Sequence, residues 1–250
     1  NMEKKRLAIV GCGKLGGIVA NAVSDGILAE YELIGVYSRT RSKAEALAMQ
    51  MPQPPRVCDS IEELLALKPD YVVEAAAPAA MRELALPALR GGASVVTLSI
   101  GAFADDAFYD EVMRTAKKHG THVYVVSGAT GGFDVLQTAT LMGGATARFF
   151  NEKGPNALRG TAVYDDALQT EQRTVFAGTA KEAIALFPTK VNVTVAASRA
   201  SVGPENMHVT MQSTPDFVGD TQRVEIRNEQ VHAVIDVYSA TSEIAGWSVV

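Results

Sequence analysis

A glycine-rich turn near the start of the chain has the spacing of a phosphate-binding loop. Gly11, Gly13 and Gly16 follow the apolar run Leu7–Val10 in the pattern G-x-G-x-x-G, and a helical pattern runs from Ile18 to Val23. In such a context the first glycine permits a tight turn, the second lets a pyrophosphate approach the backbone, and the third lets the helix pack closely on the strand. The helix N–H groups and the positive end of its dipole then face the phosphates. The pattern predicts a dinucleotide site, and the alternative is an ordinary glycine-rich strand-to-helix turn.

The end of the second predicted strand indicates which dinucleotide is bound. A strand is expected over Tyr31–Tyr37, and an NAD site usually has an Asp or Glu at its end to hold the ribose 2′-hydroxyl. Here Ser38 stands at that position, followed by Arg39 and Thr40. A hydroxyl beside an arginine accepts a 2′-phosphate that a carboxylate would repel. We therefore expect NADP to be accepted or preferred over NAD; the alternative is a solvated basic helix start.

Strands alternate with helices through the first half of the chain. Further strand-like runs are Tyr71–Pro78, Ala93–Leu98 and His122–Val126, with helical patterns between them. Such alternation requires right-handed parallel crossovers, so the fold class is α/β with a doubly wound parallel (Rossmann) sheet. Ligands bind such a sheet at the carboxyl ends of its strands. The small residues at the end of the third run and just after the fourth are therefore expected beside the cofactor, and they are Ala77, Pro78, Ser99 and Gly101.

The pattern changes after Val126. Helices are expected over Asp134–Met142, Thr179–Phe187 and Val191–Ala200, and the intervening runs alternate as antiparallel strands do. These runs are Ala145–Phe150, Thr161–Tyr164, Met207–Gln212, Gln222–Arg227 and Val231–Tyr238. We expect a dinucleotide-binding domain over 1–126, an α+β substrate and dimerisation domain over 127–239, and a helix within 240–250 packing back on the first domain.

Composition excludes several functional classes. The net charge of −5 provides no basic field for nucleic acid, and no apolar run is long enough for a membrane span. The charged start runs directly into a strand, so no signal peptide is expected. The two cysteines, Cys12 and Cys58, have neither metal-type nor disulfide-type spacing, which fits a reducing cytoplasm and no bound metal. The exposed face of an antiparallel sheet would also explain a homodimer.

At the level of longer segments, the chain resembles the L-aspartate dehydrogenase family. The segments that carry the resemblance occur in order along nearly the whole chain. They are the glycine turn, Val73–Ala76, Ser99–Ala102, Ser127–Asp134, Phe176–Ala183 and Phe187–Val193. The segment Asn206–His208 matches the place where the family carries its catalytic histidine.

The resemblance implies a reaction. L-Aspartate would be oxidised with NAD or NADP to iminoaspartate, which hydrolyses to oxaloacetate and ammonia, and the imine can also feed NAD biosynthesis. It further implies that His208 is catalytic and that Ala129 and Asn192 contact the cofactor. The chain departs from the family in having Gly203-Pro204 where an Asp-Pro pair is usual. It also has Tyr238–Ser242 where an Asn-Pro-Lys-Thr-Ser stretch is usual, so that the lysine is lost.

This reaction defines what the side chains must do. A hydride leaves Cα for the nicotinamide, and a base with a pKa near ~6.5, such as histidine, suits removal of the amine proton. For His208 without the resemblance, a hydrogen-bonded strand histidine is the alternative. The substrate carboxylates are expected to meet Thr241, Ser242 and Arg199. Arg199 shares a helix face with Asn192 and could replace the lost lysine; the alternative is a surface arginine.

The complete predicted cofactor-binding set is Gly11, Gly13, Lys14, Leu15, Gly16, Ser38, Arg39, Thr40, Ala77, Pro78, Ser99, Gly101, Ala129 and Asn192. Two other functions fit the same motifs, because a fold does not fix an activity. One is a related dehydrogenase or reductase acting on another amino acid, an imine or a semialdehyde. The other is a non-catalytic NADP-binding protein.

Overall fold

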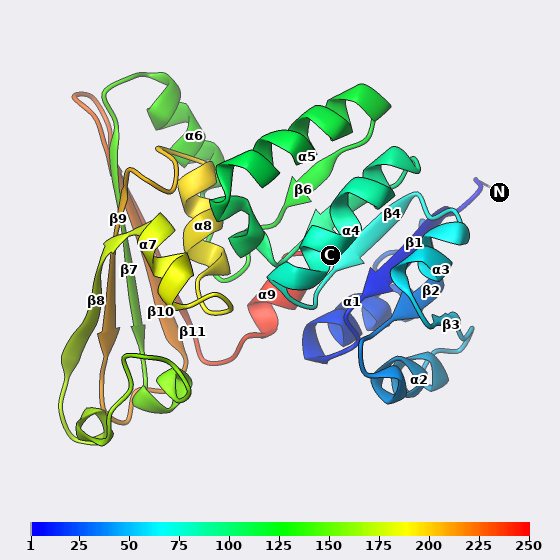
Figure 1. The fold of residues 1–250 in the computed structure, drawn as a ribbon, viewed down its shortest axis with the longest axis horizontal. Helices are drawn as coiled ribbons and strands as arrows, with labels where there is room; N and C mark the ends of the chain where they lie inside the picture. Colours follow the sequence, from blue (N-terminus) through cyan, green and yellow to red (C-terminus); the bar gives the residue numbers. More distant parts are fainter. Residues whose placement is uncertain (1) are drawn as a thin grey trace. The chain divides into compact units, whose positions relative to one another are not determined.

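The computed structural model describes residues 2–250, and this part of the chain divides into two compact units (Figure 1). Unit 1 runs to Val126 and includes Ala245–Val250, while unit 2 comprises Ser127–Ile244. No helix among the described residues is long and apolar enough to cross a membrane.

Unit 1 contains the parallel sheet that the sequence predicts. Within residues 2–250 this sheet has six strands in the order β3-β2-β1-β4-β5-β6, and every pairing is parallel. The strands are β1 (Lys5–Val10), β2 (Tyr31–Tyr37), β3 (Arg56–Cys58), β4 (Tyr71–Glu74), β5 (Ser94–Thr97) and β6 (Val123–Val125). Leu7 to Val10 are all buried because β1 lies inside the sheet with helices on both faces. The chain order reverses between β1 and β4, which is where such sheets bind ligands.

Helices connect these strands. They are α1 (Lys14–Ser24), α2 (Arg41–Met49), α3 (Ile61–Ala66), α4 (Pro78–Arg90) and α5 (Asp106–His119), with a 3₁₀ helix over Ile100–Ala104. Local signals set several ends: the Ser60 side chain accepts from the Glu63 N–H, and the Asp105 side chain accepts from the Phe108 N–H. At the carboxyl end of the chain, α9 (Glu243–Trp247) is followed by Val249, which packs on the core that α1 and α2 form.

Two features of unit 1 differ from the prediction. The strand β3 was not expected, because three residues at the edge of a sheet are too few to show an alternating pattern. The helix α1 begins at Lys14 rather than at Ile18, so its first turn starts directly after Gly13.

Unit 2 contains a second, mixed sheet in the order β11-β10-β7-β9-β8. Its strands are β7 (Thr146–Lys153), β8 (Arg173–Thr179), β9 (Met207–Ser213), β10 (Asp220–Arg227) and β11 (His232–Ser239). The pairs β10–β11, β10–β7 and β8–β9 are antiparallel, and β7–β9 is parallel. The α+β class is confirmed, and β9 lies between β7 and β8.

The helices α6 (Phe133–Leu141), α7 (Ala180–Leu186) and α8 (Asn192–Arg199) lie on one side of this sheet (Figure 1). Together with Leu158 and Leu168 from the segment after β7, they bury an apolar core against alternate strand residues such as Phe149 and Val209. We call this the helix-covered face. The opposite face carries the remaining strand residues, many of them charged, and we call it the open face.

The strands of unit 2 differ from the prediction at two places, where one predicted strand is absent and one observed strand was not predicted. Thr161–Tyr164 forms no strand and lies in turns after a short 3₁₀ helix. The strand β8 was missed because its pairing with β9 shifts register between Thr174 and Phe176, and this irregularity interrupts the period of two on which a sequence prediction depends.

Candidate functional site

A cleft of about 380 Å³ opens at the carboxyl ends of β1, β2 and β4. Its walls come from the glycine turn after β1, the residues after β2, and the start of α4 after β4. Of the predicted cofactor set, the cleft brings together Gly11, Gly13, Ser38, Arg39, Thr40 and Ala77. It lies at the position where a doubly wound sheet binds a dinucleotide.

The glycine turn has the geometry that phosphate binding requires. Gly11 has a φ of +98°, and a Cβ there would come within 2.6 Å of the Ala75 backbone. At Gly16 a Cβ would lie 2.0 Å from the Gly11 carbonyl oxygen, so only glycine allows the helix to start this close to the turn. A Cβ at Gly13 would meet no described atom within 4 Å, which leaves the space above that backbone open to a ligand.

The first turn of α1 also suits an anion. Its N-cap residue is Gly13, no side chain caps it, and the first turn carries no acidic residue. The first turn of this 11-residue helix therefore offers its unpaired N–H groups without an acidic residue of its own. These observations fit a bound pyrophosphate.

The residues after β2 line the far wall of the cleft. The Ser38 hydroxyl accepts from the Thr40 N–H at 3.3 Å, which holds the turn in place. The neighbouring Arg41 pairs with Glu45 and Asp59 on the protein surface, whereas Arg39 has no ion-pair partner among residues 2–250. Arg39 is exposed and lines the cleft, so its guanidinium is available to a phosphate.

A buried carboxylate ties together the loops after β4 and β5. Glu74 accepts from the Thr97 hydroxyl at 2.8 Å, the Ser99 N–H at 2.9 Å, the Ser99 hydroxyl at 2.7 Å and the Ala76 N–H at 2.8 Å. Burial raises the pKa of Glu74 while these donors oppose the rise. Ser99 was predicted to bind the cofactor, but its hydroxyl is committed to Glu74. Its observed contacts are therefore those of a residue that positions the loop.

Other members of the predicted set lie outside the lining of this cleft: Lys14, Leu15, Gly16, Pro78, Ser99 and Gly101. Cys12, which lies inside the glycine turn, does line it. Burial raises the pKa of the Cys12 thiol to about 11, so this thiol is un-ionised at physiological pH.

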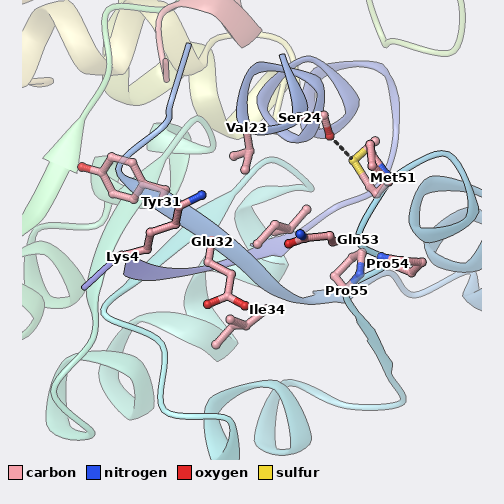
Figure 2. Close-up of a pocket in the computed structure, with 12 residues that line it drawn as sticks. Lys4, Val23, Ser24, Tyr31, Glu32, Ile34, Met51, Gln53, Pro54 and Pro55 are labelled. Atoms are coloured by element: carbon pink, nitrogen blue, oxygen red, sulfur yellow. Dashed lines mark hydrogen bonds between the residues drawn. The ribbon is translucent and has the colours of Figure 1, made fainter. Parts of the chain in front are cut away.

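A larger cleft of about 610 Å³ lies elsewhere in unit 1, and Figure 2 shows its lining. Tyr31 begins β2 and Lys4 directly precedes β1, while Ser24 ends α1 and Met51 lies just after α2. The Ser24 hydroxyl contacts the Met51 sulfur at 3.1 Å. This cleft contains none of the predicted site residues. Parallel sheets bind ligands at the opposite strand ends, so we do not place the cofactor here.

In unit 2 the second glycine-rich turn packs on the start of α8. A Cβ at Gly128 would lie 3.1 Å from the Val193 side chain, so the turn that holds Ala129 is a neighbour of Asn192. Arg199 is the last residue of this eight-residue helix and lies two turns away from Asn192. Thr241 and Ser242 are exposed after β11.

His208 lies on the open face of the second sheet. It pairs in register with Arg148 on β7 and with Thr179 on β8, between the buried neighbours Met207 and Val209. The imidazole is therefore exposed in unit 2, and the helices of this unit lie on the other side of the sheet.

The sequence prediction missed a row of polar side chains, some of them buried, on the helix-covered face. Ser239, Asp220, Lys153 and Ser213 are paired in register across four neighbouring strands, with Asn151 and Gln222 paired in the next row of the same face. Lys153 and Ser213 are 5% and 0% exposed. The sequence signal for this row lies in β7, where every second residue is buried. The buried residues Ala147 and Phe149 are apolar, and the next two, Asn151 and Lys153, are polar.

Two family profiles match the chain. Residues 11–126 match the NAD binding domain of homoserine dehydrogenase, and residues 134–250 match the C-terminal domain of aspartate dehydrogenase. Among curated proteins, the L-aspartate dehydrogenase of Methanocella arvoryzae is 32% identical over 244 residues, which are 95% of this chain and 89% of that protein. The L-aspartate dehydrogenase of Methanosarcina mazei is 32% identical over 229 residues, or 90% and 84% of the two chains.

Solved structures share the fold. Aspartate dehydrogenase from Thermotoga maritima superposes with a TM-score of 0.76 at 24% identity and covers 99% of this chain and 94% of that one. A hyperthermophilic archaeal homoserine dehydrogenase in complex with NADPH superposes with a TM-score of 0.65 at 16% identity, covering 98% and 95%. At these identities the likeness concerns the arrangement of strands and helices.

Proposed function

Because this chain belongs to the L-aspartate dehydrogenase family, we propose that it oxidises L-aspartate to iminoaspartate with NADP or NAD. Hydrolysis of the imine then yields oxaloacetate and ammonia, and the imine is also a proposed precursor for NAD biosynthesis. The observation that carries the proposal is the identity of 32% to L-aspartate dehydrogenases over nearly the whole chain. In this proposal unit 1 holds the dinucleotide and unit 2 supplies groups for the substrate.

The cleft in unit 1 fits the dinucleotide. Its pyrophosphate would lie over Gly13 and the start of α1, and its adenosine ribose would lie beside Ser38, Arg39 and Thr40. The oxidised nicotinamide, when bound, supplies the hydride acceptor. Arg39 offers a guanidinium to a 2′-phosphate and no carboxylate follows β2, so we propose a preference for NADP. Of the other predicted contacts, Lys14, Leu15, Gly16, Ala77, Pro78, Ser99, Gly101, Ala129 and Asn192 remain proposals.

The substrate amine must lose a proton before hydride departure is complete. The sequence assigns this step to His208, and the assignment remains a proposal. An imidazole is chemically suited to it at neutral pH. The exposed position of His208 on the open face makes the assignment open to a direct test by substitution.

The substrate carboxylates need hydrogen-bond donors. Thr241, Ser242 and Arg199 remain the proposed donors. Arg199 is the charged member of this set, and its place at the end of α8 can be tested through the KM for L-aspartate in Arg199→Ala. An unchanged KM would remove Arg199 from the substrate site.

The experiment that tests the function is a substrate screen in the oxidative direction. Purified protein is mixed with NADP or NAD and with single L-amino acids, and reduced nicotinamide is followed by absorbance. We expect L-aspartate to give the highest kcat/KM. A higher value with another amino acid, or with an imine or semialdehyde in the reverse direction, would support the related-dehydrogenase alternative. Tight NADPH binding without turnover of any of these would support the non-catalytic alternative.

The open face of the second sheet suits a homodimer. It carries both signs of charge, Arg148 and Arg223 beside Glu225 and Asp236, together with the half-exposed Val234. A face with both signs is self-complementary under two-fold symmetry. We propose that a second copy packs on this face. Light scattering should give a dimer mass for the wild type and a monomer mass for Val234→Glu.

The proposed setting is the cytoplasm. Both cysteines are free and buried, as expected where thiols stay reduced.

A further inference from the structure

The cleft at the carboxyl ends of β1, β2 and β4 is lined by a carboxylate that the proposed function does not use. Glu83 on α4 lines this cleft together with Arg39 and Lys43 from the segment after β2. Its side chain is exposed, and among residues 2–250 it makes no hydrogen bond and no ion pair. An ionised carboxylate accepts hydrogen bonds and donates none, so Glu83 is free to accept one from a ligand in the cleft.

The residues around Glu83 form an apolar wall. Ala79 and Ala80 precede Glu83 by about one turn of α4, and all three line the cleft. The buried Ile61, the first residue of α3, lines it as well. These alanine and isoleucine side chains carry no hydrogen-bonding group. Together they suit the flat face of an aromatic base, which leaves Glu83 to contact a polar group on the edge of that base.

The charges in the cleft indicate which part of the dinucleotide Glu83 can contact. A carboxylate repels the pyrophosphate and a 2′-phosphate, whereas Arg39 and Lys43 attract them. No ion pair joins Glu83 to either cation within the described residues, so the cations stay available to phosphate and the carboxylate stays available to a donor. On the base itself the donor is the exocyclic amino group of adenine, and carboxylates accept from exocyclic amino groups of bases in nucleic-acid recognition.

From this arrangement we infer that Glu83 is a specificity-determining residue, which accepts a hydrogen bond from the exocyclic amino group of adenine. Hypoxanthine carries a carbonyl oxygen at the same position, and its lone pairs would face the carboxylate. Glu83 therefore favours adenine over hypoxanthine. The inference rests on the proposed function for the presence of the dinucleotide in this cleft, and it adds recognition of the base by a residue outside the glycine motif.

The inference is tested with NADPH and its deaminated analogue, reduced nicotinamide hypoxanthine dinucleotide phosphate. The Kd of each is measured by fluorescence titration of the full-length protein. The wild type should bind NADPH roughly 3- to 10-fold more tightly than the analogue, the effect of one hydrogen bond near solvent. In Glu83→Gln the two Kd values should agree within about twofold, because an amide can accept from adenine or donate to hypoxanthine.

The matched control is Glu62→Gln, which changes an exposed glutamate next to Ile61 that does not line the cleft. It should keep the wild-type ratio of the two Kd values. Equal binding of both dinucleotides by the wild type, or an unchanged ratio in Glu83→Gln, would overturn the inference while oxidation of L-aspartate stands. An equal weakening of both dinucleotides in Glu83→Gln would also overturn it, since Glu83 would then contact a part other than the base. Conversely, Glu83-dependent preference for NADPH without oxidation of L-aspartate would sustain the inference and reject the proposed function.

Discussion

His208 and Lys153 project from opposite faces of one hydrogen-bonded sheet. On β7, Arg148 is the register partner of His208, and Lys153 is five residues farther along the same strand. Successive side chains alternate between faces, so an odd separation places the two groups on different sides. The imidazole therefore lies on the face of the sheet that the helices of unit 2 leave uncovered, and the ammonium lies on the face that they cover.

The first prediction concerns His208. If His208 removes the substrate proton, His208→Asn should lower kcat for L-aspartate by roughly 10²–10⁴, because general-base catalysis contributes about that factor to a rate. Steady-state kinetics measure kcat, and light scattering checks that the molecular mass of the variant is unchanged. A kcat within about twofold of the wild-type value would remove His208 from the reaction.

A second prediction concerns the choice of dinucleotide. Arg39→Ala should raise the KM for NADP by roughly 10- to 100-fold, because one charge-assisted phosphate contact is lost, and should change the KM for NAD by less than about threefold. The matched control is Arg41→Ala, whose guanidinium pairs with Glu45 and Asp59. An equal rise in the KM for NADP and for NAD in Arg39→Ala would show that Arg39 does not contact the 2′-phosphate.

A third prediction concerns the buried carboxylate of Glu74. Each of its oxygens accepts a backbone N–H, from Ser99 on one side and from Ala76 on the other. In Glu74→Gln the amide NH₂ must face one of these donors, which should lower the free energy of unfolding by about 1–3 kcal/mol and weaken NADPH binding. Urea denaturation and fluorescence titration measure the two effects.

The control for Glu74 is Glu111→Gln, whose carboxylate is 47% exposed and lies 3.9 Å from Arg90. Its effect on the free energy of unfolding should stay within about 0.5 kcal/mol. Equal stability of Glu74→Gln and the wild type would mean that the loops after β4 and β5 do not depend on these hydrogen bonds.

A fourth prediction follows from the thiol in the glycine turn. Because burial raises the pKa of Cys12 to about 11, roughly one thiol in a thousand is ionised at pH 8. The other cysteine, Cys58, is also buried and its pKa is also raised by burial. Iodoacetamide at pH 8 should therefore leave NADPH binding intact over an hour. Rapid inactivation that NADPH prevents would contradict the buried position of Cys12.

A fifth prediction concerns the dependence of stability on pH. Burial lowers the pKa of Lys153 in the folded protein, so the unfolded chain binds more protons between that pKa and about 10.4. The free energy of unfolding attributable to this group should rise as the pH rises through that window, with Asp220 and Lys190 as the charged neighbours. Urea titrations from pH 7 to 10 should show this rise in the wild type and not in Lys153→Met. Parallel curves for the two proteins would disprove it.

Much of unit 1 could be predicted from local patterns. The run Leu7–Val10, the glycines after it and the capping residue Ser60 each act over a few residues, and the structure contains the elements that they indicate. The contribution of Glu74 could not be foreseen, because its partners Thr97 and Ser99 become neighbours only when β4 and β5 pair.

In unit 2 the decisive relationships are between distant strands. The alternation of Met207–Gln212 is visible in the sequence, but which face of the strand the helices cover depends on the pairing of β9 with β7 and β8. For this reason His208 could be recognised by its motif while its exposed position could not. Lys153 escaped attention for the opposite reason: no motif marks it, and only burial beside Ser213 makes it chemically unusual.

The central claim, oxidation of L-aspartate with a nicotinamide dinucleotide, is tested most directly in the reverse direction. Oxaloacetate and ¹⁵N-ammonia are incubated with the protein and NADPH or NADH, and the product is identified by mass and chirality. The account predicts ¹⁵N-labelled L-aspartate formed in step with oxidation of the dinucleotide, faster with NADPH. Formation of malate or of no product with either dinucleotide, by protein that binds NADPH, would contradict it.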